Sequence, residues 1–198
     1  PSWEILGIKD IIKSSIIANQ KFLLEVNSLY REKGAVPNSY KLRRKDAFLE
    51  TGNLSAAFQR MTQEPKSKQK ELDKIYKLVV LNHSFLTSLA SMGSFIKTHS
   101  TTPASVHFKN LIEAINQNLD KAVDLLSDKE TDIKVEQPEA LKEALEFFQE
   151  NFKSMINADR SIDVSNNNLQ EKQLIFTQLK WLLNISQNLV TTISKTNF

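Results

Sequence analysis

The stretch from Leu78 to Ile96 contains no Asp, Glu, Lys or Arg, and this feature most restricts how the chain can fold. Drawn as a helix, the stretch places apolar side chains on every face. Such a helix lies either at the centre of a protein or in a bilayer. Its polar residues need hydrogen-bond partners that lipid does not supply, so we predict a buried central helix rather than a membrane span. These polar residues are Asn82, His83, Ser84, Thr87, Ser88, Ser91 and Ser94.

The rest of the chain also has helical periodicity, because apolar residues recur every three or four positions and no segment alternates at period two. With only four glycines and five prolines, the composition argues against β architectures and phosphate-binding loops. We predict an all-α bundle of about six mostly antiparallel helices, forming one domain over residues 1–198. The expected segments are 3–33, 38–64, 66–98, a helix capped by Thr102–Pro103 that runs to 126, a helix opened by Pro138 after the polar connector 127–137, and a helix after Asn166–Asn168.

The usual residues of catalysis and metal binding are sparse. There is no cysteine, and the three histidines, His83, His99 and His107, are not spaced four apart as a helical metal site requires. No glycine-rich phosphate motif occurs. We therefore expect no cofactor, no metal site and no catalytic residue.

Charge is unevenly distributed along the chain, although the net charge is only +3. Residues 41–80 hold ten Lys or Arg against five acids, and residues 120–150 hold ten acids against four lysines. These patches are either two solvated helix faces or surfaces that attract each other between copies of the chain. The basic patch also suits anionic lipid headgroups or an acidic small molecule. Nucleic acid is not expected, because aromatic residues are not interleaved with the basic ones.

Arg43, Arg44 and Asp46 are the first candidate site residues. We expect them to form an ion-pair network that fixes the second predicted helix against the third. The alternative is a ligand site in which Arg43 or Arg44 binds a carboxylate through its guanidinium group.

Asn82 and His83 are the second candidates, since they stand together in the uncharged helix. We expect a core histidine that is hydrogen-bonded to Asp46 or Glu50; the alternative is a ligand contact or a proton-sensitive switch at His83. Trp181 lies among Leu182, Leu183 and Ile185, so we expect it to pack in the core.

Residues 40–96 carry the one specific resemblance. The pattern resembles the C-terminal soluble domain of the YccS/YhfK family, bacterial inner-membrane proteins related to fusaric-acid-resistance and aromatic-acid exporters. The residues that carry it are Arg43–Arg44, Asp46–Ala47, Asn53–Leu54, Phe58, Met61, Glu64–Pro65, Leu81–Asn82–His83, Leu86, Leu89 and Gly93.

The resemblance implies a cytoplasmic domain at the inner membrane of a bacterium, cut from a larger efflux-type transporter. The implied role is assembly or regulation through self-association of the parent protein, and the resemblance names no transported solute. Two other classes remain: a free-standing helical module that binds a protein or nucleic acid, and an enzyme, which a deep polar pocket around His83 would favour.

Overall fold

The computed structural model describes residues 3–32, 34–66, 69, 71–99, 101, 104–129, 139–157 and 165–198, with only the backbone described for 3–6, 151–152, 154–157 and 165–170. This part of the chain forms six α-helices and contains no strand, so the predicted all-α bundle is confirmed. The helices are α1 (Trp3–Glu32), α2 (Asn38–Thr62), α3 (Leu72–Thr98), α4 (Val106–Leu126), α5 (Glu139–Asn157) and α6 (Ser165–Ser194).

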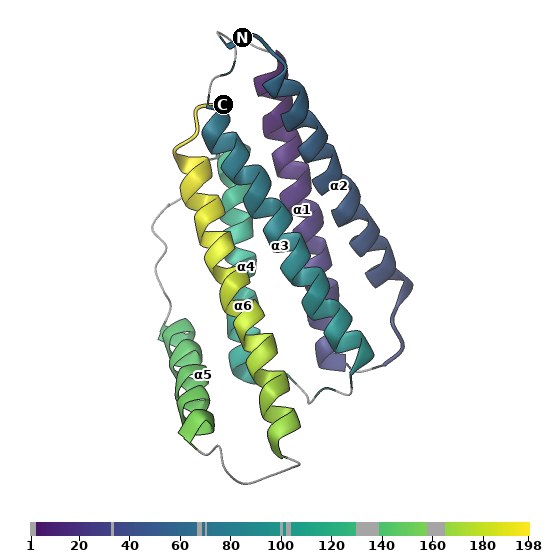
Figure 1. The fold of residues 1–198 in the computed structure, drawn as a ribbon, viewed down its shortest axis with the longest axis vertical. Helices are drawn as coiled ribbons and strands as arrows, with labels where there is room; N and C mark the ends of the chain where they lie inside the picture. The colour runs from purple at the N-terminus through teal and green to yellow at the C-terminus, as the bar shows by residue number, and fades with distance from the viewer. Residues whose placement is uncertain are drawn as a thin grey trace.

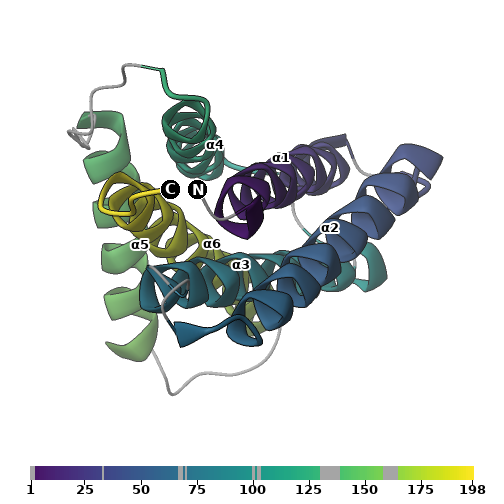
Figure 2. The same cartoon turned by 90° about the horizontal axis from the view of Figure 1, so that it is seen from above.

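Four of the helices form a ring. In it α1 contacts α3, α3 contacts α6, α6 contacts α4, and α4 contacts α1. The other two lie outside the ring: α2 packs on α1 and α3, and α5 packs on α4 and, less extensively, on α6. Seen from above, α1 and α4 make one side of the molecule, α3 and α6 make the other, and α2 and α5 flank the two ends (Figure 2).

The chain thus consists of two halves with the same helix order. In each half the first and third helices, α1 and α3 or α4 and α6, run parallel because an antiparallel helix connects them (Figure 1). The halves meet through two antiparallel pairs, α1 with α4 and α3 with α6. Consecutive helices are antiparallel, as the short connections predict.

Three helices begin at other residues than predicted. The third helix begins at Leu72 and not at residue 66, because Glu71 has a left-handed backbone (φ 58°) that a helix cannot contain. The fourth is capped by Ser105, whose hydroxyl accepts a hydrogen bond from the Phe108 amide at 3.2 Å. The sixth already begins at Ser165, so the three asparagines from Asn166 lie inside it. The predicted cap Thr102–Pro103 and the opening residue Pro138 lie outside the described residues.

One hydrophobic core runs through all six helices, and α1, α3, α4 and α6 each contact three other helices. In the described residues only α3 is long and apolar enough to cross a membrane, and half of its most apolar window is buried in the structure. The helix meets α1 and α2 very closely at Gly93. A Cβ built there would lie 2.5 Å from the Tyr40 hydroxyl and 3.1 Å from Val26, so only glycine fits this crossing without a shift.

Candidate functional site

In each half, one buried pair of polar side chains joins the two parallel helices of the ring. In the first half, the Asn19 side-chain amide on α1 donates to Asn82 Oδ1 on α3 at 3.2 Å, and both residues are fully buried. In the second half, the Asn118 amide on α4 donates to the Ser186 hydroxyl on α6 at 3.0 Å. Asn82 is therefore a packing residue that joins α1 to α3, and it does not open to a surface.

Arg43 and Asp46 lie on the α1 side of α2, not on the α3 side. Arg43 Nη1 is 3.6 Å from Asp46 Oδ2, one turn away on the same helix. Both line a small cavity of about 220 Å³ between α1 and α2, together with Glu50 and Lys21. The predicted ion-pair network between the second and third helices is wrong, because the i,i+3 spacing lets this pair form within α2.

Arg44 is separate from this pair. Its side chain is exposed, and the guanidinium carbon lies 4.7 Å from the centre of the Phe48 ring. The structure therefore places Arg43 with Asp46, leaves Arg44 on the outer surface of α2, and puts neither arginine beside Asn82 or His83.

His83 is exposed on the outer face of α3, toward α6. The expectation of a core histidine bonded to Asp46 or Glu50 is wrong, because those two carboxylates face α1 on the other side of α2. His83 instead lines an open groove of about 770 Å³ between α3 and α6. Trp181 lines the same groove and is 52% exposed, so the prediction that it packs in the core is also wrong.

The groove is hydroxyl-rich, and its only charged or titratable lining residues are His83 and Lys180. The Ser88 hydroxyl donates to Gln178 Oε1 at its floor and so joins α3 to α6. Among the described residues that line the groove there is no carboxylate. The lining residues are His83, Ser84, Thr87, Ser88, Ser91, Thr177, Gln178, Lys180, Trp181 and Asn184.

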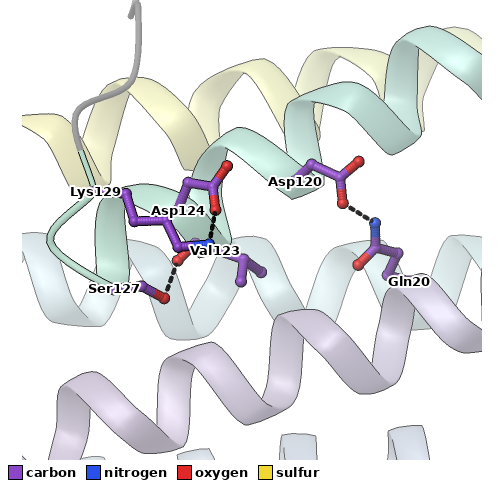
Figure 3. Close-up of polar contacts among 6 residues, drawn as sticks. All are labelled: Gln20, Asp120, Val123, Asp124, Ser127 and Lys129. Atoms are coloured by element: carbon purple, nitrogen blue, oxygen red, sulfur yellow. Dashed lines mark hydrogen bonds and ion pairs between the residues drawn. The ribbon is translucent and has the colours of Figure 1, made fainter.

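The opposite side of the ring, between α1 and α4, is bridged by polar contacts. The Gln20 side-chain amide donates to Asp120 Oδ1 at 2.6 Å (Figure 3). It also donates to Asn116 Oδ1 at 2.9 Å. Lys9 Nζ on α1 lies 2.6 Å from Asp128 Oδ1, just past the end of α4. At that end the Ser127 hydroxyl donates to the Val123 carbonyl at 2.7 Å (Figure 3).

Aromatic rings attach α5 to the ring of helices. His107 on α4 stacks on Phe147 at 4.1 Å between ring centres. Phe148, the next residue of α5, stacks on Phe176 of α6 at 4.4 Å. The rings therefore hold the middle of α5 against both helices of the second half.

A charged pair joins the two halves where α3 begins. Lys74 Nζ lies 2.6 Å from Glu71 Oε2 and donates to the Lys195 carbonyl, just after α6, at 2.6 Å. The hydrogen bond from Lys74, and further hydrogen bonds from Asn197, lower the pKa of the Glu71 carboxyl below its ordinary value. Because Lys195 and Asn197 follow α6, these contacts fasten the C-terminal tail to the start of α3.

Within the described ranges, no three His, Cys, Asp or Glu side chains come close enough to share a metal ion. Sequence reasoning named His83 but missed the groove, whose walls come from residues about ninety positions apart. The one available signal was the run of small polar residues on α3, which we interpreted as buried.

No known protein family, curated protein or solved structure matches the chain.

Proposed function

We propose that this chain is a non-catalytic assembly or regulatory domain that associates with further copies of itself beneath the bacterial inner membrane. Its parent would be an efflux-type transporter similar to the YccS/YhfK proteins. The domain would hold neighbouring copies of that transporter together on the cytoplasmic side.

The observation that carries this proposal is the separation of charge between the two sides of the fold. Helix α2 carries five Lys or Arg against two acids and α3 carries three against one, whereas α5 carries four Glu against two Lys. In α4 and α6 the two signs differ by a single charge. Opposite surfaces on one molecule attract when two copies meet, and they orient the encounter. A uniformly solvated surface would not need this separation.

The resemblance supports the same conclusion through packing. Seven of the sixteen residues that carry it are buried in α2 and α3, and these seven determine how helices pack rather than any reaction. These buried residues are Ala47, Leu54, Met61, Asn82, Leu86, Leu89 and Gly93.

The test is removal of the domain from the full-length transporter. We expect the truncated protein to insert into the membrane, but to give fewer oligomers on native gels and in chemical crosslinking than the full-length protein. A truncated protein that assembles and transports like the full-length one would refute the proposal.

The basic side favours a second candidate, a module that binds an anionic surface. Each Lys or Arg near an anionic bilayer adds about 1 kcal/mol, so vesicles with phosphatidylglycerol should retain the chain more than neutral vesicles do. DNA or RNA binding with a steep salt dependence would instead identify a free-standing nucleic-acid-binding module.

A further inference from the structure

Of the four places where neighbouring helices of the ring meet, three are closed on the outside. The α1–α3 junction is covered by α2, and the α4–α6 junction by α5. The α1–α4 junction is bridged by Gln20 and Lys9. In the described residues, the α3–α6 junction has no covering helix; the Ser88–Gln178 hydrogen bond joins its two helices, and the junction holds the groove.

The walls of this groove suit a helix better than a compact ligand. The α3 wall combines three small side chains, Ser84, Ser88 and Ser91, beside which a third helix can approach closely, with the exposed His83 and Thr87. Trp181 supplies a large exposed ring, the type of residue that anchors protein interfaces. Lys180 lines the groove, and Lys77 lies exposed two turns before Ser84 on the same face of α3.

Helix α5 carries the complementary surface. Glu139, Glu143, Glu146 and Glu150 follow an i, i+4, i+7, i+11 pattern, and all four are exposed. Phe147 stands beside them and is 44% exposed. The four carboxylates span about 16 Å of helix, and the α3 face from Lys77 to Ser91 spans about 21 Å, so the acidic face fits within the length of the groove.

This α5 cannot occupy the groove of its own molecule. It packs on α4, and its Phe147 stacks on His107, which places it outside the α4–α6 junction. Its acidic face is thus presented to solvent, and the occupant of the groove must come from another copy. When the same two surfaces meet reciprocally, they form a closed two-fold dimer.

We propose that the acidic face of α5 from one copy docks into the α3–α6 groove of a second copy; this interface rests on the self-association proposed above. Trp181 is its central apolar contact, and Lys77 and Lys180 face the glutamates.

The test uses two charge-reversed forms of the 198-residue chain. The first carries Glu143→Lys and Glu146→Lys on α5, and the second carries Lys77→Glu and Lys180→Glu at the groove. In each form alone, like charges face each other at both contacts of the dimer. In an equimolar mixture, every α5 meets a groove of opposite charge.

In sedimentation equilibrium at low salt, we expect each form alone to associate at least about tenfold more weakly than the parent, and the mixture to recover the parent constant as a heterodimer. Trp181→Ala should weaken association without any charge change. Lys41→Glu with Lys45→Glu is the matched comparison, because it changes the same charge on the exposed surface of α2 and should weaken association less than reversal at the groove does. Circular dichroism of each variant establishes that it is folded.

Two results would overturn this interface. If the parent chain associates but the charge-reversed forms associate equally well, or if their mixture recovers nothing, copies meet through another surface and the proposed self-association stands. A parent chain that stays monomeric at all concentrations would refute both the interface and self-association of the domain.

Discussion

Helices α2 and α5 occupy equivalent places in the two halves, yet they are held in different ways. Helix α2 is buried at six positions spread from Tyr40 to Met61, and it contacts both α1 and α3. Helix α5 buries Leu141 and Ala144 among its described side chains and contacts α6 much less than α4. The aromatic rings at its middle supply much of its remaining contact.

The difference shows that the outer helix of a half can either complete the core or add a surface to it. In the first half, the outer helix completes the core, so its loss would expose much of α1 and α3. In the second half, α4 and α6 pack well against each other, and the outer helix adds a charged surface to a core that is already formed. We therefore expect substitutions on the buried face of α2 to destabilise the whole molecule, and substitutions on the buried face of α5 to act locally.

The largest expected contrast comes from matched leucine truncations. Leu54→Ala in α2 removes a fully buried side chain and should lower the free energy of unfolding by about 3–4 kcal/mol. Leu141→Ala in α5 should cost about 2 kcal/mol. Urea denaturation measures both values, and hydrogen exchange should show lost protection confined to α5 in the second variant. Equal global losses would contradict the comparison.

The buried polar pairs give the next contrast. Asn82→Ala leaves the buried Asn19 amide with only a long hydrogen bond, at 3.5 Å, to the backbone carbonyl of residue 82, and should cost about 2 kcal/mol. Asn118→Ala should cost about 1 kcal/mol, because the Ser186 hydroxyl also donates to the Leu183 carbonyl at 2.7 Å and keeps that bond.

Thermal denaturation of both single variants tests this order. The double variant Asn19→Ala/Asn82→Ala should lose less stability than the sum of its single changes, since the pair is removed together. Strict additivity would mean that the two amides do not act as a pair.

A smaller effect is expected where α2 and α3 cross. Gly93→Ala should lower stability by about 1 kcal/mol, because crowding against the Tyr40 hydroxyl exceeds the gain in helix propensity. Tyr40→Phe removes the crowded oxygen, so the double variant should recover most of the loss. Chemical denaturation of the parent, the two single variants and the double variant measures the coupling free energy between the two positions. If the double variant recovers no stability, the strain lies at Val26 instead.

The smallest effect is expected at the junction of the two halves. Because the folded-state pKa of Glu71 is lowered, its ionised form stabilises the fold above the ordinary carboxyl pKa, and this contribution is lost as pH falls through the folded value. Glu71→Gln should therefore flatten the acid side of the stability–pH curve and change little near neutrality. An unchanged curve would show that the C-terminal tail is held without this carboxylate.

The periodicity of apolar residues predicted the elements well, because each amphipathic stripe records which side of a helix is buried. The predicted end of the first helix at Gly34 and the start of the second at Asn38 agree with the structure to within about a residue. The start of α3 was missed because the left-handed backbone at Glu71 has no sequence signature of its own.

The site was predicted poorly for a related reason. Helix α3 is apolar on every face, so its periodicity does not say whether His83 or Asn82 turns inward. Which face becomes a groove depends on where α6 packs, and α6 is ninety residues further along the chain. Trp181 was assigned to the core from its leucine neighbours, yet those neighbours point to the other side of α6.

The C-terminal tail returns to the helix at which the chain begins, since Lys9 Nζ lies 5.9 Å from the centre of the Phe198 ring. Both ends of the chain therefore meet at one end of the bundle (Figure 1). A short linker between them, with a new break between α3 and α4, would give a circular permutant in the order α4, α5, α6, α1, α2, α3. Because the two halves have the same helix order, this permutant would keep every contact of the ring, and the order of synthesis of the halves could be exchanged without altering the fold.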